Sequence, residues 1–422
     1  MLAVIGAGYV GLATAVGLAR HGFQVTLFEQ DHERLDVLRR GDLPFGEPSV
    51  EGAYQEVLGQ TLAVDHPSSI RPGVEFDFAF ICVGTPPLPE GSLDLSYVHG
   101  VADHIAAVTE GVTPIVIRST VPPGTAADLE ARLRTRHPNV SVVANPEFLR
   151  EGLALADFEH PSRRVVGGSN LKHVSALRDL YRFSEAPVVV TDATSAELIK
   201  IGANAALAVR LSMVNEIADV AMALGVDPLA VLAGIGADPR IGPDYLRPGL
   251  GFGGACLPKD LDAMRTTARA FSARSNVFDA AAQTNADAIE RVTDEVEHRL
   301  DGRGAVCVAG VGFKPGSDQV RDSRPMLLVE ALLERGIKVA VFDRLAEDNA
   351  RRVLGDRVNY IASLEKLDGG VGLVVFTHGA PYPAPKLPAH VEAIDGLGDT
   401  LSMPSADAIE PTASLLTARE RA

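Results

Sequence analysis

Short runs of β-branched and apolar residues alternate with longer periodic stretches over about the first 190 residues of the chain. Runs of the first kind predict strands, and the periodic stretches between them predict helices. This alternation favours a parallel sheet covered by helices on both faces. The predicted strands are residues 2–5, 24–28, 76–83, 114–118, 140–144 and 188–191.

The middle of the chain changes to a mostly helical pattern, and the α/β pattern returns after it. Apolar residues over 195–225 and 276–300 predict two long helices, separated by a Gly- and Pro-rich loop region over 234–262. From residue 304 onward, we expect strands over 305–311, 338–342 and 372–377 and a helix over 324–335.

These patterns predict an α/β protein with two Rossmann-like, doubly wound domains joined by a central helical domain that contains a long helix. We expect the N-terminal domain over residues 1–191, the helical domain over 192–301 and the smaller C-terminal domain over 302–403. The tail, residues 404–422, has no clear pattern and is expected to be disordered. The active site is expected in the cleft between the two α/β domains.

The charge of the chain limits the classes of partner. The formal net charge of −16 opposes binding to a phosphate backbone, so we expect no nucleic acid partner. An anionic substrate must therefore be held by a local cluster of Lys and Arg. The chain shows no signal-peptide pattern and no apolar run of transmembrane length, which predicts a cytoplasmic protein with no membrane partner.

The three cysteines form neither a disulfide framework nor a CxxC pair, so no metal site is expected. Cys82 and Cys307 lie in apolar strand patterns, where a cysteine usually packs as a small inert hydrophobe. Cys256 differs because it follows the glycine-rich residues 251–254. Such a backbone suits a loop that approaches a ligand closely.

A glycine fingerprint follows the first predicted strand, at residues 6–11 (GAGYVG). Gly6 permits a tight turn, Gly8 lets a pyrophosphate approach the backbone, and Gly11 allows close packing of the helix on the strand. Glu29 ends the second predicted strand, where its carboxylate can accept both ribose hydroxyls and repel a 2′-phosphate. The pattern therefore favours NAD over NADP. A flavin uses the same fingerprint, and a glycine turn that binds no nucleotide is the remaining alternative.

Several longer motifs appear in one order along nearly the whole chain, and this order resembles that of the UDP-glucose/GDP-mannose dehydrogenase family. The motifs are residues 6–11, 83–86 (VGTP), 119–122 (STVP), 145–152 (NPEFLREG), Lys200 with Asn204, 251–260 (GFGGACLPKD) and 313–316 (FKPG). The resemblance implies an NAD-dependent, four-electron oxidation of the C6 primary alcohol of a nucleotide sugar to a carboxylate. It implies a thiohemiacetal on Cys256, which holds the aldehyde until the second oxidation, and then a thioester on the same sulfur.

The resemblance also implies roles for residues around Cys256. Lys200 would stabilise charge on the reacting oxygen, Asp260 would act as a base or position water, and Glu147 would be the base for thioester hydrolysis. The residues themselves add support, because Lys200 and Asn204 are four positions apart and share one helix face. A lysine among apolar neighbours also needs a partner or a lowered pKa. The predicted catalytic residues are Cys256, Lys200, Asp260, Glu147, Asn204 and Thr120, of which Thr120 would orient the water.

Binding residues follow from the same motifs. The predicted cofactor-binding residues are Gly6, Gly8, Tyr9, Val10, Gly11, Glu29, Arg34, Thr85, Thr120, Glu151 and Arg321, the last reaching cofactor across a subunit boundary. The predicted substrate-binding residues are Phe148, Leu149, Lys200, Asn204, Arg240, Tyr245, Arg247, Gly251, Lys259 and Lys314. Among these, the arginines suit bidentate phosphate contacts and Lys314 a point charge. Lys259, with nearby N–H groups, could also raise the thiolate fraction of Cys256.

The chain departs from the family in its nucleotide-recognition part. Leu397 follows Asp395 and Gly396 where the family has an arginine, residues 377–388 are Pro-rich, and Gln319 replaces an acidic residue. UDP-glucose is the first expected substrate, with GDP-mannose or another sugar- or nucleoside-derived alcohol as the alternative. A two-electron hydroxyacid or polyol dehydrogenase and a catalytically retired NAD-binding paralogue also stay open. The apolar middle helices predict a homodimer.

Overall fold

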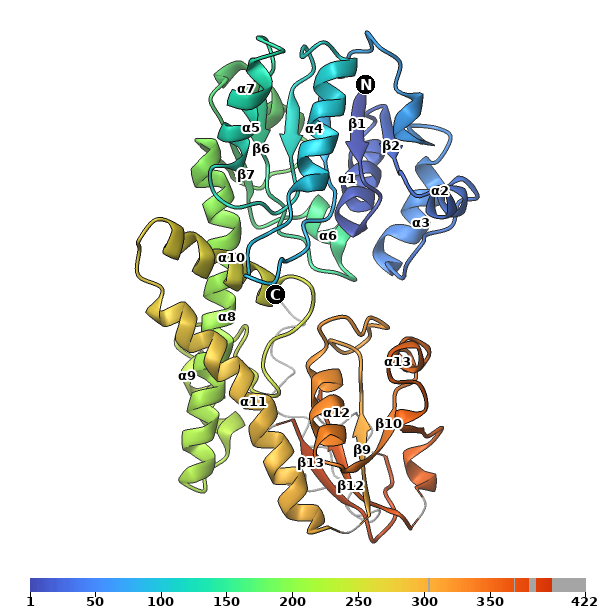
Figure 1. Ribbon diagram of the computed structural model, residues 1–422, viewed down its shortest axis with the longest axis vertical. Helices are drawn as coiled ribbons and strands as arrows, with labels where there is room; N and C mark the ends of the chain where they lie inside the picture. Colours follow the sequence, from blue (N-terminus) through green and yellow to red (C-terminus); the bar gives the residue numbers. More distant parts are fainter. Residues whose placement is uncertain (303, 368, 379–384, 397–422) are drawn as a thin grey trace, which may run out of the picture. The chain divides into compact units, whose positions relative to one another are not determined.

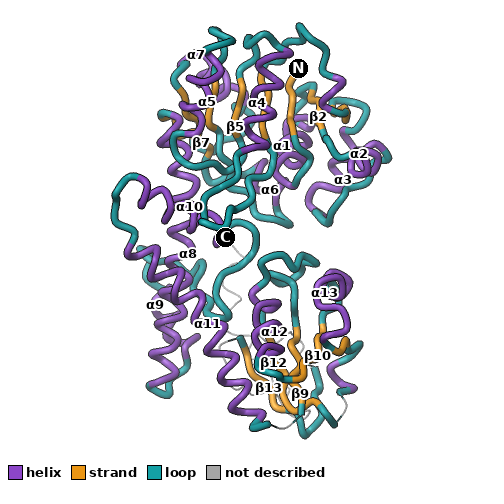
Figure 2. Tube along the Cα trace, viewed as in Figure 1, coloured by secondary structure: helices purple, strands orange, loops and turns teal. Residues whose placement is uncertain are grey.

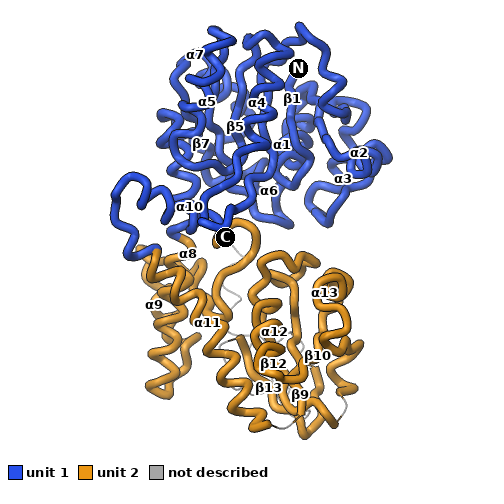
Figure 3. The backbone as a smooth tube through the Cα atoms, viewed as in Figure 1, with its two compact units in different colours: residues 1–206, 259–278 blue, residues 207–258, 279–422 orange. Residues whose placement is uncertain are grey.

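The structure is a computed structural model that describes residues 1–302, 304–367, 369–378 and 385–396 (Figure 1). Strands alternate with helices in its N- and C-terminal parts, and the middle is helical (Figure 2). The chain divides into two compact units (Figure 3): Met1–Ala206 with Lys259–Phe278, and Leu207–Pro258 with the rest from Asp279. The long helix α8 (Ala193–Ala223) belongs in part to each unit. The three-domain division given above stays a prediction.

The first unit contains an eight-stranded sheet in the order β3-β2-β1-β4-β5-β6-β7-β8. All six predicted strands are present with ends that differ by at most two residues, but β3 and β7 were not predicted. Neighbouring strands run parallel except β6 and β7, which corrects the expectation of a parallel sheet at this one pairing. The strands are β1 (Leu2–Ile5), β2 (Val25–Phe28), β3 (Leu62–Asp65), β4 (Phe78–Ile81), β5 (Ile115–Ile117), β6 (Val142–Ala144), β7 (Arg164–Gly168) and β8 (Val188–Thr191).

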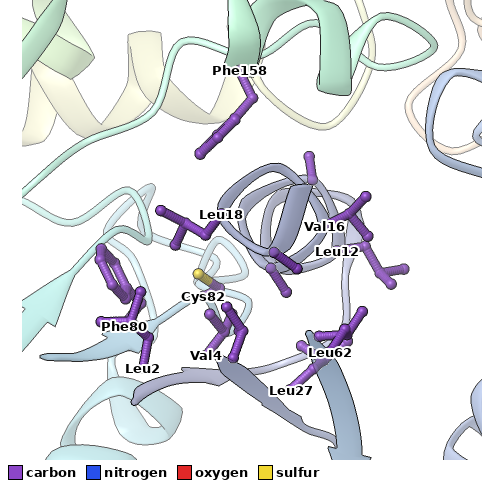
Figure 4. Close-up of a cluster of buried hydrophobic side chains, with 14 of the residues drawn as sticks. Leu2, Val4, Leu12, Val16, Leu18, Leu27, Leu62, Phe80, Cys82 and Phe158 are labelled. Atoms are coloured by element: carbon purple, nitrogen blue, oxygen red, sulfur yellow. The ribbon is translucent and has the colours of Figure 1, made fainter. Parts of the chain in front are cut away.

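Both faces of this sheet are buried. Alternate residues of each strand face opposite sides, so each strand contributes side chains to two apolar clusters. In β1, Leu2 and Val4 belong to one apolar cluster and Ala3 and Ile5 to another. Figure 4 shows the first cluster, in which side chains of the first helix pack against those of β1, β2 and β3. The helices of this unit are α1 (Tyr9–Arg20), α2 (His32–Arg39), α3 (Pro48–Val57), α4 (Ser96–Val108), α5 (Thr125–Arg134), α6 (Ala154–Glu159), α7 (Leu171–Leu180) and α10 (Leu257–Ala270), with a 3₁₀ turn at Pro67–Ser69.

The register of the sheet aligns the last residues of five strands. Ile5 pairs with Phe28 on one side and Ile81 on the other, Ile81 pairs with Ile117, and Ile117 pairs with Ala144. The loops that follow these strands therefore leave the sheet at one edge. In an open α/β sheet, this carboxyl edge is where ligands bind.

The second unit contains a five-stranded parallel sheet in the order β11-β10-β9-β12-β13. Its core includes apolar side chains of the long helix α11 (Asn276–Leu300), which has the predicted bounds. The region predicted as a loop over 234–262 is shorter than expected, because α9 (Pro228–Gly236) and α10 occupy its two ends. The other elements are β9 (Ala305–Ala309), β10 (Lys338–Phe342), β11 (Asn359–Tyr360), β12 (Val371–Phe376), β13 (Glu392–Asp395), α12 (Arg324–Glu334), α13 (Glu347–Leu354) and the 3₁₀ turns Gly355–Arg357 and Leu364–Lys366.

None of the helices in the described part of the chain combines the length and hydrophobicity that a membrane span requires.

Candidate active site

The glycine fingerprint forms the turn between β1 and α1. Gly6 has a φ of +101°, and a Cβ there would lie 2.8 Å from the Cys82 carbonyl oxygen. A Cβ on Gly11 would lie 1.8 Å from the carbonyl oxygen of Gly6, so only glycine lets α1 start this close to the turn. A Cβ on Gly8, in contrast, has no described atom within 4 Å. The turn is thus packed on the protein side and open at Gly8, an arrangement that fits a pyrophosphate at the start of α1. Tyr9 and Val10 begin α1 and are half-buried.

Glu29 directly follows β2 and is buried. One carboxylate oxygen accepts the N–H of Ala7 at 3.1 Å, and the other accepts the N–H of Asp31 at 2.9 Å. Arg34 donates to the Ala7 carbonyl oxygen at 3.1 Å. Glu29 and Arg34 therefore hold the glycine turn from one side. Each carboxylate oxygen keeps a further acceptor site, which leaves Glu29 able to accept ribose hydroxyls as predicted.

The loops after β4 and β5 are joined by side-chain hydrogen bonds. The Thr85 hydroxyl donates to the Thr120 carbonyl oxygen at 2.8 Å, and the Ser119 hydroxyl donates to the Val83 carbonyl oxygen at 2.6 Å. Glu197 of α8 anchors the second of these loops, because its carboxylate accepts the N–H groups of Gly124 at 2.7 Å and Ala126 at 2.8 Å. Thr120 is therefore held from both ends of its loop.

Lys200 and Glu147 form a buried ion pair in the first unit. The Lys200 Nζ lies 3.1 Å from Glu147 Oε1, and each side chain is only 5% exposed. The prediction that a buried Lys200 requires a partner is confirmed. The second carboxylate oxygen of Glu147 accepts the N–H of Leu149, and Lys200 Nζ lies 5.4 Å from the centre of the Phe148 ring. Two residues with predicted catalytic roles thus neutralise one another in a region closed to bulk water.

Asn204 and Asp260 form a second, partly buried contact one turn along α8. The Asn204 amide donates to Asp260 Oδ2 at 2.6 Å, and Lys259 Nζ lies 2.8 Å from Asp260 Oδ1. Asp260 is 1% exposed and lies in the first turn of α10. Further along α10, Ala263 packs in an apolar cluster with Ile201 of α8. The α8 face that was predicted to carry Lys200 and Asn204 therefore contacts Glu147 through Lys200 and Asp260 through Asn204.

The three cysteines have different surroundings. Burial raises the pKa of the Cys82 and Cys307 thiols to about 12, as expected of inert packing residues. Cys256 is half-buried and immediately precedes α10. It therefore lies beside the N–H groups that begin this helix, whose partial positive charge favours a negative charge on sulfur.

The glycines before Cys256 serve protein packing. A Cβ on Gly251 would lie 2.2 Å from Asn285 Oδ1, and one on Gly253 would lie 2.4 Å from the Asp322 carbonyl oxygen. Asn285 also accepts the N–H of Phe252 at 2.7 Å and donates to its carbonyl oxygen at 3.0 Å. In the second unit Gly251 and Gly253 approach Asn285 and Asp322, and the approach of this loop to a ligand stays a prediction.

Comparison with known proteins agrees with this geometry. Three models of the UDP-glucose/GDP-mannose dehydrogenase family match in succession: the NAD binding domain over residues 1–184, the central domain over 194–287 and the UDP binding domain over 307–386. The UDP-glucose 6-dehydrogenase of Pseudomonas aeruginosa is 38% identical over 359 residues, which is 82% of this chain and 79% of the relative. That of Rhizobium meliloti is 36% identical over 365 residues, 84% of this chain and 83% of the relative. The solved UDP-glucose dehydrogenase of Pyrobaculum islandicum superposes with a TM-score of 0.88 at 36% identity, covering 94% of this chain and 93% of that one.

The chain belongs to the UDP-glucose/GDP-mannose dehydrogenase family.

Membership in the UDP-glucose/GDP-mannose dehydrogenase family confirms the predictions of an enzyme, of the α/β fold class and of NAD as cofactor. The chain is a nucleotide-sugar dehydrogenase that uses NAD. That Gly6, Gly8, Gly11 and Glu29 of the first unit bind the dinucleotide stays a prediction.

The predicted substrate-binding residues of this nucleotide-sugar dehydrogenase are divided between the two units. In the first unit, Phe148 and Leu149 follow Glu147 and are half-buried. Glu151, predicted to bind cofactor, is half-buried in the turn before α6. In the second unit, Arg240 is exposed and bonded to Asp238, with its Nη2 2.6 Å from Oδ2 of that residue. Because Asp238 already holds the Arg240 fork, phosphate would have to compete for it.

Other substrate-side predictions concern the loops of the second unit. Tyr245 is exposed with a φ of +56°, and Arg247 donates to the His378 carbonyl oxygen at 3.1 Å. Lys314 is half-buried, with Nζ 5.3 Å from the centre of the Phe313 ring. Arg321, which was predicted to bind cofactor, is exposed. Leu397, the tail over 404–422 and residues 379–384 of the Pro-rich segment lie outside the described residues.

Sequence reasoning missed several residues that hold this site together. Glu47 accepts the N–H of Gly152 at 2.7 Å, and the Arg163 guanidinium lies 3.8 Å from the centre of the Phe148 ring. Arg118 and Glu197 were missed as well. The available signal was position alone: Arg118 immediately precedes the STVP motif, and Glu197 lies one turn before Lys200 on α8. Neither position shows which residue the side chain contacts.

Proposed function

We propose that the chain oxidises the C6 primary alcohol of UDP-glucose to the carboxylate of UDP-glucuronate, through a thiohemiacetal and a thioester on Cys256. The observation that carries the proposal is the buried Glu147–Lys200 pair, followed one turn along α8 by the Asn204–Asp260 contact. The names of the relatives support UDP-glucose as the substrate, since two of them are UDP-glucose 6-dehydrogenases with 36% and 38% identity.

Bound NAD would accept a hydride in each of the two oxidations, and Gly6, Gly8, Gly11 and Glu29 would hold it. The Lys200 ammonium would stabilise negative charge on the substrate oxygen as the alcohol loses its proton. The Cys256 sulfur would then add to the aldehyde carbon, with the new alkoxide taking up a proton. This addition prevents loss of the aldehyde before its second oxidation gives the thioester.

Hydrolysis of the thioester would use the same carboxylates. Glu147 would take a proton from the attacking water, the carbon–sulfur bond would break, and Cys256 would leave as the thiolate. Asp260, oriented by Asn204 and Lys259, would hold the water or take up the proton. Glu147 accepts the N–H of Leu149 and Asp260 accepts the Asn204 amide, so each carboxylate has a restricted orientation at the start of the reaction.

The test is the Cys256→Ser variant, with Cys307→Ala as a matched control that removes a buried thiol from the second unit. The wild type should produce two NADH for each UDP-glucose consumed, together with UDP-glucuronate measured by chromatography. Cys256→Ser should lose the carboxylate product, and Cys307→Ala should keep it. Unchanged UDP-glucuronate output from Cys256→Ser would refute the thioester route, and a ratio of one NADH would refute the four-electron oxidation.

The base of the nucleotide is tested separately, by thermal-shift measurements with UDP-, GDP- and dTDP-hexoses. Selective stabilisation by UDP-glucose supports the proposal, whereas selective stabilisation by GDP-mannose would replace the substrate. We also propose a homodimer, because apolar side chains are exposed on α8 (Val220, 60%), directly after it (Leu224, 72%) and on α9 (Leu229, 56%). Sedimentation analysis that finds a monomer at micromolar concentration would contradict this state.

A further inference from the structure

Arg118 is a buried cation held by uncharged oxygens. It directly follows β5, it is 3% exposed, and its hydrogen-bond partners among the described residues are Thr14 and Asn145, neither of which carries a charge. Its Nε donates to the Thr14 hydroxyl at 2.7 Å, and its Nη1 donates to Asn145 Oδ1 at 2.9 Å. A charge removed from water is costly unless its hydrogen bonds are well made. The two fixed directions of the guanidinium therefore determine where Thr14 and Asn145 lie relative to one another.

The Thr14 contact leads to the cofactor turn. Thr14 lies on α1, and its hydroxyl donates to the Val10 carbonyl oxygen at 2.7 Å while it accepts from Arg118. A hydroxyl has one donor and can accept in addition, so both bonds can be formed together. Val10 belongs to the glycine fingerprint and lies in the first turn of α1. Arg118 is thus tied through one hydroxyl to the start of the helix that would face the NAD pyrophosphate.

The Asn145 contact leads to Glu147. Asn145 is 1% exposed, its Oδ1 also accepts the Tyr181 hydroxyl at 2.6 Å, and its Nδ2 donates to the Val165 carbonyl oxygen at 2.8 Å. These bonds leave the Asn145 side chain one orientation. Only Pro146 separates Asn145 from Glu147, and a proline fixes its own φ and restricts the residue before it. The orientation of Asn145 therefore sets the position from which Glu147 reaches Lys200.

We propose that Arg118 is a positioning residue that, by holding Asn145 against α1, fixes the Glu147 carboxylate opposite Lys200. The inference rests on the proposed function, in which Glu147 assists hydrolysis of the Cys256 thioester. It follows that a disturbed Arg118 slows hydrolysis while the two oxidation steps stay fast. The thioester then accumulates on Cys256.

Two variants test this role. Arg118→Lys keeps the charge but loses the planar fork, so one ammonium cannot keep both directed contacts. We expect kcat to fall by about tenfold, since small misplacements of a reacting group cost one to two orders of magnitude. The KM for UDP-glucose should stay close to that of the wild type. Tyr181→Phe removes only the hydroxyl that donates to Asn145, and it should lower kcat in the same sense by a smaller factor.

Tyr54→Phe is the matched control. Tyr54 is also fully buried in the first unit, and its hydroxyl donates to the Leu38 carbonyl oxygen at 2.8 Å. Both tyrosine variants should lower Tm to a similar degree, and only Tyr181→Phe should lower kcat. The inference is overturned if the two tyrosine variants have the same kcat, or if Arg118→Lys raises KM with kcat unchanged. Should Arg118→Lys fail to fold, the comparison of the two tyrosine variants decides alone.

Quenched samples analysed by intact mass separate this inference from the proposed function. Arg118→Lys and Tyr181→Phe should show a larger fraction of covalent adduct on Cys256 than the wild type during turnover. If Cys256→Ser abolishes UDP-glucuronate formation but neither variant accumulates adduct, the positioning role is wrong and the proposed function stands. If Cys256→Ser still forms UDP-glucuronate, the proposed function itself fails.

Discussion

Breaking the buried Lys200–Glu147 pair should destabilise the first unit strongly. Lys200→Met leaves the Glu147 carboxylate 5% exposed with its cationic partner removed, and Glu147→Gln removes the carboxylate that lies 3.1 Å from the buried Lys200 ammonium. Removing one partner of a buried pair costs about 3–5 kcal/mol. The first unit contains 206 + 20 = 226 residues, and about 2–4 °C of Tm per kcal/mol is typical of that size. Each single variant should therefore lower the Tm of this unit by about 6–20 °C.

The free-energy cost of the double variant decides whether Lys200 and Glu147 are coupled. Lys200→Met with Glu147→Gln buries no unpaired charge, so its cost should be smaller than the sum of the single costs by about 2 kcal/mol. Calorimetry without NAD measures the Tm and the free energy of unfolding of the wild type, the two single variants and the double variant. The exposed pair of Arg132 and Asp103, 2.8 Å apart with side chains 47% and 46% exposed, is the control. Arg132→Met should cost less than about 1 kcal/mol. Additive single costs, or a Lys200→Met effect no larger than that of Arg132→Met, would refute the reasoning.

Two further predictions concern Glu197 and the glycine turn. Burial raises the pKa of Glu197 from 4.5 to about 7, so the native state binds a proton that the unfolded state lacks, and stability falls as pH rises from 4.5 to 7. In thermal scans across this range, Glu197→Gln should gain about 3 kcal/mol relative to the wild type as pH rises, and a constant difference would contradict the assignment. Gly11→Ala places a Cβ 1.8 Å from the Gly6 carbonyl oxygen and should abolish NAD binding by calorimetric titration. Gly100→Ala in α4, which has nothing described within 4 Å, should bind NAD normally.

The hydrophobic pattern alone was sufficient to predict the bounds of some strands and helices. The strands β1, β8 and β10 and the helix α11 have the predicted bounds, because each is apolar or periodic over its full length. β7 was missed because its sequence, RVVGG, begins with a buried arginine and ends with two glycines. A Cβ on Gly167 would lie 2.3 Å from the Asp192 carbonyl oxygen. The glycines are therefore required by packing against a neighbouring segment, which the strand's own sequence does not show.

The site residues divide in the same way into those indicated by their own sequence and those whose role depends on distant segments. The motif residues Glu147, Lys200 and Asp260 were predicted by resemblance, and the burial of Lys200 was predicted from its apolar neighbours. Arg118 gave no such signal, since an arginine at the end of a strand is usually solvated. Its role depends on partners 104 and 27 positions away in the chain, which only the folded sheet brings together.

The place of β5 in the sheet explains why Arg118 can make both contacts. β5 lies between β4 and β6, and Ile117 at its end pairs with Ile81 and Ala144 at the ends of those strands. Asn145 follows β6 and is therefore the neighbour of Arg118 at the same edge, while α1 follows β1 on the far side of β4 and packs on the sheet. A short side chain at position 118 would contact Asn145 alone. The long guanidinium spans both, so the cofactor turn after β1 and the carboxylate after β6 are coupled by one residue located between them.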